Sequence, residues 1–265
     1  IAAFLDEKYC TLYIDLSGES LFKRGWRTDK GEAPLKENMA AGLLKLSGWT
    51  PDMPLLDPFC GSGTIAIEAA SIACGLVPGI SRSFGFEKLL NFDRELWTEL
   101  REDAKSEVNL HREVSITASD ISSIVVRKAE ANALRAGLGG LLESGNLKFS
   151  VCDARNVLPP TETPGIIVAN PPYGEQSTPR SATVGSMMRH VADNLKHNFA
   201  GWTAWMLTSD RHLPGEMHLK EGRKTVLFNG PLECRFFKFD LVAGSNRRVK
   251  NRDAASDSTP SDAES

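Results

Sequence analysis

The chain has 265 residues, of which 41% are apolar and 25% are charged, and its formal net charge is −3. This composition is typical of a globular protein and excludes a collagen-like or low-complexity chain. The slightly acidic balance also excludes a protein that binds nucleic acid through a strongly basic surface. No run approaches the roughly 18 consecutive apolar residues of a membrane span, and no signal-peptide pattern opens the sequence. We therefore expect a cytoplasmic protein that does not contact a membrane.

The cysteine content argues against disulfides and metal. Five cysteines are present, an odd number, widely spaced and without a C-x-x-C pair. This pattern supports neither a disulfide framework nor a zinc site, and the histidines show no ligand spacing. We expect small buried thiols at Cys10, Cys60, Cys74, Cys152 and Cys234, and no bound metal.

The two ends of the chain differ from its middle. The sequence starts at Ile1 and soon enters an alternating, strand-like stretch, "KYCTLYIDLSG", which we interpret as part of a longer protein cut near a domain boundary. The last residues lose all apolar periodicity and are rich in Ser, Asp and Pro. We expect three segments: an N-terminal strand and linker from an upstream domain over residues 1–30, one folded domain over 31–244, and a polar flexible tail over 245–265.

Between these ends, strand patterns alternate with helix patterns, which predicts an α/β fold with a mainly parallel sheet. Strands are expected at residues 55–59, 116–120, 147–153, 166–169, 203–208, 224–228 and 234–242, and helices at 36–46, 64–74, 94–110, 121–136 and 185–199. Because only "NGP" and its neighbours separate the last two strands, these should form an antiparallel hairpin.

The first of these strands runs into a glycine turn, "LLDPFCGSGTIAIEAA". The spacing Gly61-x-Gly63-x-x-Ala66 fits a strand-to-helix turn whose backbone N–H groups can approach a ligand closely. By itself, a turn that merely requires positive φ explains the glycines equally well. Asp57 precedes the turn, and its carboxylate suits a ligand with a cationic amine better than a pyrophosphate, which it would repel.

Two further acidic residues end successive strands, Asp120 in "SITASD" and Asp153 in "LKFSVCD". Ligands of open parallel sheets bind at the carboxyl ends of the strands. Asp120 could accept from both hydroxyls of a ribose and Asp153 from the exocyclic amine of adenine, although either alone could instead be a helix N-cap. A fourth strand ends in "NPPYG", so four strand ends together indicate one ligand site.

The stretches "DPFCGSGT", "ASD", "VCDA" and "NPPYG", preceded by "KRGWRTDKGEAPLKENMAAGLL", resemble the S-adenosylmethionine-dependent RNA methyltransferases that accompany a THUMP domain. Within these, the sequence is most similar to the bacterial large-subunit ribosomal RNA guanine-N2 methyltransferase group. The resemblance covers roughly residues 17–242. It implies a seven-stranded Rossmann-like class I methyltransferase sheet, mainly parallel, with a C-terminal antiparallel hairpin.

The resemblance also implies roles for individual residues. S-adenosylmethionine, or its product S-adenosylhomocysteine, would bind to strand ends, the glycine turn and a stretch ahead of the first strand. These residues are Pro34, Leu35, Glu37, Asp57, Phe59, Cys60, Gly61, Ser62, Gly63, Thr64, Asp120, Ile121, Asp153, Ala154 and Asn170. The substrate would be RNA, selected with the help of an upstream THUMP-like domain, and the protein a monomer. Trp26 departs from the family, in which a Tyr is more usual.

The "NPPYG" stretch has a chemical interpretation in this context. An exocyclic base amine is a poor nucleophile, because its lone pair is delocalised into the ring. The Asn170 side-chain oxygen and the Pro171 carbonyl are two acceptors that can orient such an amine towards a methyl donor. Pro172 stiffens the loop, and Tyr173 offers a face on which a flipped-out base can stack. The alternative is that this stretch is only a turn after a strand.

Three other functions remain open at this point. An adenine-N6 DNA methyltransferase and a protein glutamine methyltransferase use the same amide-like geometry, but the glutamine enzymes lack the "RGWR…APLKE" element. A non-catalytic module that binds the cofactor and scaffolds ribosome assembly is a different class, and the intact "NPPY" argues against it.

Overall fold

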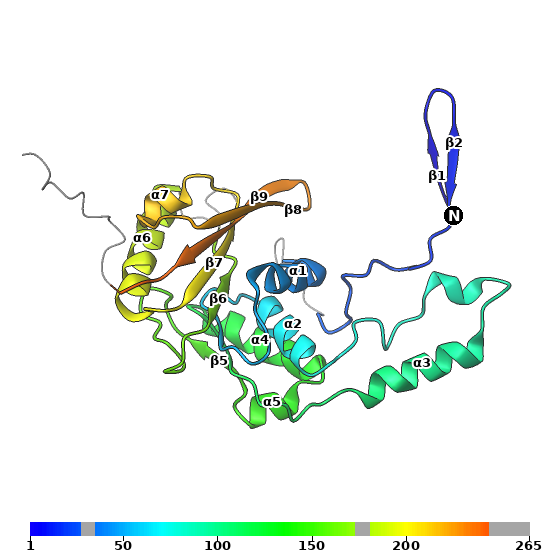
Figure 1. Ribbon diagram of the computed structural model, residues 1–265, viewed down its shortest axis with the longest axis horizontal. Coiled ribbons are helices and arrows are strands. Elements are labelled where there is room, and N and C mark those ends of the chain that lie inside the picture. Colours follow the sequence, from blue (N-terminus) through cyan, green and yellow to red (C-terminus); the bar gives the residue numbers. More distant parts are fainter. Residues whose placement is uncertain (28–34, 173–180, 244–265) are drawn as a thin grey trace, which may run out of the picture.

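The computed structural model describes residues 1–27, 35–172 and 181–243, and it contains the expected α/β fold (Figure 1). Its main sheet has seven strands in the order β5-β4-β3-β6-β7-β9-β8. The bounds are Leu55–Asp57 for β3, Ile116–Asp120 for β4, Leu147–Val151 for β5, Ile166–Ala169 for β6, Thr203–Thr208 for β7, Arg223–Asn229 for β8 and Leu232–Asp240 for β9. Strands β3 to β7 are parallel, and β9 pairs antiparallel with both β7 and β8, which confirms the predicted hairpin.

The helices agree with the expected ranges to within a few residues, with two corrections. The helices are α1 (Glu37–Ser47), α2 (Thr64–Ala73), α3 (Arg94–Ser106), α4 (Ser123–Arg135), α5 (Gly139–Glu143), α6 (Ser181–Asn198) and α7 (Leu213–Met217). α3 ends four residues before the predicted end, and α4 begins at Ser123 because Ser122 caps it, with its side chain accepting from the Val125 N–H. The short elements α5, α7 and the 3₁₀ turn η1 (Gly85–Lys88) were not predicted.

The sheet lies between two helical layers, because its central strands β3, β6 and β7 are buried on both faces. One buried cluster joins Leu55 and Val168 of the sheet to α1, α2 and α5, and the other joins Leu56 and Ile167 to α6 and α7. Figure 1 shows α1 and α2 on one side of the sheet and α6 and α7 on the other. Trp202, just before β7, and Trp205, within it, are both buried in the core.

The order of the strands fixes where a ligand can bind. From β3 the chain adds β4 and β5 on one side of the sheet and then returns to add β6 and β7 on the other side. The successive connections therefore diverge between β3 and β6, which is the switch point where open α/β sheets bind ligands. Register pairs Leu55 with Ile116 and with Ile166, so the three strands end at the same edge.

The first strands lie apart from this sheet. β1 (Ala2–Leu5) and β2 (Cys10–Tyr13) form a separate antiparallel hairpin whose residues are all exposed, and it extends away from the sheet in Figure 1. Only the second of these strands was predicted. Cys10 is exposed and Cys152 half-buried, so the expectation of five buried thiols is wrong for these two. Within the three described ranges, no helix has the length and apolar character needed to cross a bilayer.

The stretch "RGWR" ties the segment ahead of the sheet to α1, α2 and α4. The Arg24 guanidinium donates to both carboxylate oxygens of Glu68 at 3.1 Å, and Arg27 donates to Glu37 at 3.1 Å. All four side chains are nearly excluded from solvent. Trp26 between them is buried, and its carbonyl accepts from Arg135 at 2.9 Å. These contacts hold the stretch against the helix that begins at the glycine turn.

Replacing Arg24 with Ala should destabilise the protein by about 3–5 kcal/mol, because Glu68 would remain as a buried charge without a partner. Burial already raises the pKa of Glu68, and the Arg24 hydrogen bond opposes this rise. Without Arg24, the Glu68 carboxyl would have to keep its proton in the folded protein. The loss of stability should therefore shrink as the pH falls towards 5. Urea unfolding at several pH values measures both effects.

Lys23→Ala is the matched control, since Lys23 forms an exposed ion pair with Glu19 at 2.9 Å. Its loss should be below about 1 kcal/mol. Equal losses for the two variants would show that the Arg24 pair does not stabilise the fold.

Candidate active site

The glycine turn connects β3 to α2 and lies against the end of β4. The Cys60 N–H donates to the Ser119 carbonyl at 2.9 Å, and the Gly61 N–H donates to the Asp120 side chain at 3.1 Å. Gly61 and Gly63 have φ of 51° and 86°, the left-handed region that favours glycine. A β-carbon on Gly63 would lie 3.0 Å from that of Ala129, whereas one on Gly61 would meet nothing within 4 Å. Gly63 is therefore required for packing, and Gly61 faces open space.

Asp57 lies at the tip of β3, directly before this turn. Its side chain is buried, one carboxylate oxygen accepts from the Phe59 N–H at 3.1 Å, and the other has no partner among the described residues. Burial, reinforced by the charge of Asp120, raises the pKa of Asp57 to about 8. A buried carboxylate with one unsatisfied oxygen suits a cationic ligand, because a positive charge would compensate its desolvation.

Asp120 ends β4 beside the turn. One of its oxygens accepts from Gly61, and the other accepts from the Ser122 N–H at 3.0 Å. The N-cap of α4 is Ser122, so the alternative that Asp120 caps this helix is wrong. Ile121, which follows, exposes 67% of its surface. Because the apolar Ile121 side chain is exposed beside the Asp120 carboxylate, it can pack against one face of a planar ring bound at the end of β4.

Asp153 and Ala154 follow β5 at the next position along the edge. Asp153 forms an ion pair with Arg155 at 2.5 Å, and this hydrogen bond, more than any other cause, holds the pKa of Asp153 below its usual value. Asn194 of α6 donates to the carbonyls of Ala154 at 3.4 Å and Val157 at 2.8 Å. α6 therefore fixes the loop that carries Asp153.

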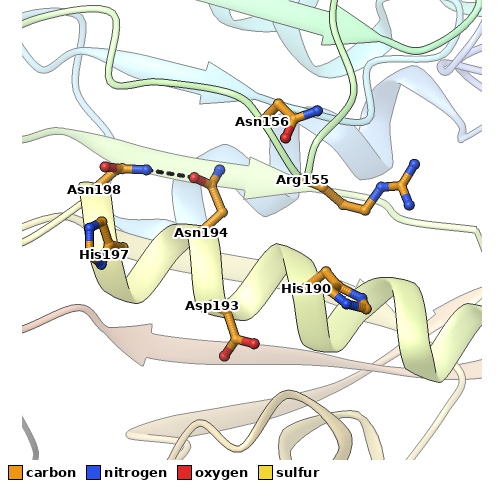
Figure 2. Close-up of a pocket in the computed structure, with 7 residues that line it drawn as sticks. All are labelled: Arg155, Asn156, His190, Asp193, Asn194, His197 and Asn198. Atoms are coloured by element: carbon orange, nitrogen blue, oxygen red, sulfur yellow. Dashed lines mark hydrogen bonds between the residues drawn. The ribbon is translucent and has the colours of Figure 1, made fainter.

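A shallow polar cavity of about 600 Å³ lies between this loop and α6. Figure 2 shows Arg155 and Asn156 on the loop, next to the helix that carries the other polar residues lining the cavity. Asn198 donates to Asn194 at 2.7 Å along that helix. The Asn194 amide nitrogen therefore donates to the loop, while its oxygen accepts from Asn198.

The "NPPYG" stretch follows β6. Asn170 is half-buried, Pro171 is buried and Pro172 is exposed. Pro171 and Pro172 line a cavity of about 640 Å³, together with residues that follow β7 and residues of α6. Tyr173 lies outside the described residues, as does Pro34, so their predicted roles stay predictions.

The stretch ahead of the first strand also approaches the turn. Leu35 and Glu37 are both buried, and Arg27 connects them to the start of α2 by donating to the Leu35 carbonyl at 3.1 Å and to the Thr64 hydroxyl at 2.7 Å. Glu37 accepts from the same guanidinium and so helps to hold Arg27 against the start of α2. Phe59 is half-buried and Cys60 is buried, where desolvation raises the pKa of its thiol; Asn132 donates to the Ser62 carbonyl at 2.9 Å.

Two kinds of residue near this edge were not predicted from the sequence. Arg24 and Arg27 belong to a stretch that was recognised, but their partners could not be seen from the sequence. Asp210 and Glu216 follow β7 and line the same cavity as Pro171. The available signal for Asp210 was its position just after a strand. In the part of the chain that the structure describes, no three His, Cys, Asp or Glu side chains are grouped to hold a metal ion.

The fold and this edge define a class I, Rossmann-like methyltransferase: a seven-stranded sheet with a reversed last strand, a glycine turn after the central strand, and acidic residues on the next two strand ends. Residues 24–238 match the family described as "RMKL-like, methyltransferase domain". The chain belongs to this family.

Relatives of known name or structure agree with the family. Ribosomal RNA large subunit methyltransferase K/L from Shewanella baltica is 43% identical over 90% of the chain, which spans 33% of that protein's length. A crystal structure of a protein assigned as a methyltransferase, complexed with SAH, is 33% identical with a TM-score of 0.77, covering 89% of this chain and 58% of its own. A predicted N6-adenine-specific DNA methylase from Listeria monocytogenes is 33% identical with a TM-score of 0.75, covering 86% and 57%.

Gly63→Ala should lower the stability by about 1–3 kcal/mol, because the new methyl group would crowd Ala129 and Phe149 at a positive φ. Gly61→Ala should cost about 1 kcal/mol, since it adds only the conformational strain. Thermal unfolding of the two variants beside the unmodified protein measures the difference. A larger loss for Gly61→Ala than for Gly63→Ala would contradict this account of the turn.

Proposed function

We propose that this chain transfers a methyl group from S-adenosylmethionine to an exocyclic amine of an RNA base, guanine N2 of large-subunit ribosomal RNA. The observation that carries the proposal is the arrangement at one sheet edge: a buried, half-satisfied carboxylate and an open glycine turn at β3, with the Asn-Pro-Pro exit at β6 beside it. The name of the Shewanella relative supports ribosomal RNA as the substrate. S-adenosylhomocysteine is the product, and no metal is needed.

The residues present fit this cofactor. The Asp57 carboxylate would pair with the cationic methionine moiety, and the backbone from Phe59 to Thr64 would surround that moiety. Asp120 would accept from the ribose, and Ile121, Asp153 and Ala154 would hold the adenine. When bound, S-adenosylmethionine supplies a methyl group on a cationic sulfur, which leaves as a neutral thioether.

The chain's own contribution is to orient the acceptor amine. The chain leaves β6 through Asn170 and Pro171, where proline restricts the backbone. The Asn170 side-chain oxygen and the Pro171 carbonyl oxygen can accept both hydrogens of a planar amine there. The amine nitrogen uses its lone pair for the new N–C bond, the S–C electron pair stays on sulfur, and the excess amine proton passes to water. Alignment and preorganised dipoles then account for the rate, without an ionised base.

The remainder of the protein would supply RNA selection. The chain spans about a third of the curated relatives that it matches, and its formal charge is −3. We therefore propose a catalytic domain over residues 31–244 that acts as a monomer in the cytoplasm, assisted by an upstream THUMP-like RNA-binding domain. Residues 1–30 would be the connection to that domain, and residues 245–265 a polar tail.

A second candidate function is adenine-N6 methylation. The Listeria relative is named as a predicted N6-adenine-specific DNA methylase, and an Asn-Pro-Pro exit suits any planar amine. Purified chain, S-adenosylmethionine and large-subunit ribosomal RNA lacking the modification should yield N2-methylguanosine on nucleoside analysis. N6-methyladenosine, or no methylated nucleoside even with the upstream region restored, would contradict the proposal.

Asn170→Ala should lower methylation by roughly 10²–10³-fold, the scale seen when one preorganised polar group is lost from a transition state. Affinity for S-adenosylmethionine and the thermal midpoint should change little. Asn170→Asp should retain more activity than Ala, because it keeps an acceptor of the same size. Steady-state rates with calorimetry on all three proteins test this, and equal rates would show that the stretch is only a turn.

Affinity for S-adenosylmethionine should rise with pH between about 6 and 7.5. Asp57 has its pKa raised to about 8 in the free protein, so it holds a proton in this range, and a cationic ligand favours the ionised form. Binding should therefore release a proton, and Kd should fall by up to about tenfold per pH unit.

Asp57→Asn should remove this dependence, since the amide cannot ionise. Asp52→Asn is the control, because Asp52 is exposed and pairs with Arg112 at 3.2 Å; it should keep the pH dependence of the unmodified protein. Calorimetry in buffers of different ionisation heat counts the protons directly. A flat Kd in the unmodified protein would exclude Asp57 from the cationic end of the site.

A further inference from the structure

The cavity of about 640 Å³ beside Pro171 and Pro172 has a composition that the methyl transfer does not explain. It is walled by the exit from β6, by the turn after β7 with α7, by α6 and by the start of β9. Apolar surface comes from Met188, Leu213 and Leu232, and charged side chains come from residues 210–212, 216 and 233. An apolar wall with a few polar groups on one side is the usual form of a pocket for a flat ligand.

Two carboxylates in this cavity face each other. Glu216 lies on α7, against Gly185 of α6, where a β-carbon would come within 2.9 Å of both its carboxylate oxygens. Asp210 lies in the turn after β7 and accepts from the His212 N–H at 2.8 Å. Burial, the charge of Asp210 and a side-chain hydrogen bond to it raise the pKa of Glu216, while His212 and Arg189 oppose the rise. The repulsion between the two carboxylates makes Glu216 keep a proton more readily, and an N–H donor bound between them would relieve the same repulsion.

The other acidic group in the cavity already has its donors. Glu233 forms ion pairs with Arg211 at 3.2 Å and with Arg235 at 2.8 Å. Neither Asp210 nor Glu216 forms an ion pair with a described residue. The acceptors left to a ligand are thus concentrated on Asp210 and Glu216.

The position of these acceptors matters because β6 and β7 are neighbours in register, with Ala169 opposite Met206. The residues that follow the two strands, Pro171 on one and Asp210 on the other, line the same cavity. A base whose amine lies at the β6 exit would turn an adjacent ring atom towards the β7 side. The carboxylates can therefore contact whatever that ring atom carries, an N–H hydrogen or a lone pair.

RNA bases with an exocyclic amine differ at this ring atom. In guanine the amine is flanked by N1–H, a donor. In adenine and cytosine it is flanked by a ring nitrogen that is only an acceptor, and a lone pair facing a carboxylate is repelled. A glutamine side-chain amide has no second donor at all.

We propose that Asp210 and Glu216 determine base specificity in this site, by accepting the N1–H of a guanine whose N2 amine lies at the Asn170-Pro171 exit. The inference rests on the proposed function and adds a reason for guanine over adenine that is independent of any relative's name. The carboxylates are specificity-determining residues: they contact the edge of the base beside the amine and take no proton from it.

Ligand-observed NMR with mononucleotides tests the contact apart from catalysis. Guanosine 5′-monophosphate should saturate the unmodified chain at concentrations at least about tenfold below those of 2-aminopurine riboside 5′-monophosphate, which keeps the amine but carries an acceptor at N1. Adenosine and 1-methylguanosine 5′-monophosphates should bind as weakly as the 2-aminopurine nucleotide.

Glu216→Gln and Asp210→Asn exchange an acceptor for an amide that can donate to an acceptor at N1. In either variant the preference for guanine over 2-aminopurine should fall by about tenfold or reverse. Glu221→Gln is the matched control: it makes the same change of charge at a residue that pairs with Lys224 and is not part of this cavity. Its preference should equal that of the unmodified chain, and calorimetry should find unchanged affinity for S-adenosylmethionine in all three variants.

The results separate this inference from the proposed function. An unchanged preference in both carboxylate variants, or no preference and no binding in the unmodified chain, would overturn the inference even if ribosomal RNA is methylated at guanine N2. If ribosomal RNA is not methylated but the nucleotide preference shifts as described, the proposed function fails while the guanine contact stands.

Discussion

The carboxylate of Asp57 sets the constraint on which the rest of the site depends. It is buried at the tip of the central strand with one oxygen unpartnered among the described residues, and burial raises its pKa to about 8. A sheet whose connections diverge at this strand leaves room for a ligand directly above it. In the free protein the Asp57 carboxyl therefore keeps its proton near neutral pH, and a cation bound there would favour the ionised form. The side chain is already buried and positioned before a ligand arrives, so little reordering is needed on binding.

The start of α2, which follows the glycine turn above Asp57, is held by buried charged side chains from neighbouring segments. Arg27 joins Glu37 on α1 to Thr64 on α2, and Arg24 pairs with Glu68 one turn further along α2. Buried ion pairs are costly unless both partners are well placed, so they specify a single arrangement more than they add stability. Here that arrangement fixes the start of α2, and with it the direction of the backbone N–H groups of the turn. The stretch "RGWR" is thus a structural part of the site, although it lies ahead of the first strand.

Periodicity and turn chemistry in the sequence were sufficient for the sheet, its reversed last strand and the main helices, because the buried strands are apolar runs between turn residues and the helices carry apolar residues at helical spacing. They were insufficient for α7 and β1. α7 has five residues and contains Pro214 and Gly215, which normally indicate a loop, and the residues of β1 are exposed on both faces, without alternation. The strand-end aspartates could be predicted for a similar reason: parallel strands end at one edge, whatever the details of packing.

Contacts between distant side chains could not be predicted in this way. The partners of Arg24 and Arg27 lie 44 and 10 residues away, and nothing in the local sequence indicates which acidic residue is buried beside them. Asp210 and Glu216 have the same character, since either alone reads as an exposed loop carboxylate. Their proposed role depends on β7 being the neighbour of β6 and on Glu216 of α7 packing against Gly185.

This difference bears on how a shared fold acquires separate substrates. The proposed roles of the Asn-Pro-Pro exit and the acidic strand ends do not distinguish one planar amine from another, and relatives with a similar sheet carry names as different as ribosomal RNA methyltransferase and predicted DNA adenine methylase. Selection must then come from groups that contact the base away from its amine. The turn after β7 is a place for such groups, because it lines the same cavity as the Asn-Pro-Pro exit. Under the proposal, a carboxylate there would admit a donor beside the amine and reject an acceptor, so a change of one or two residues in this turn would alter the substrate while the Asn-Pro-Pro exit stays the same.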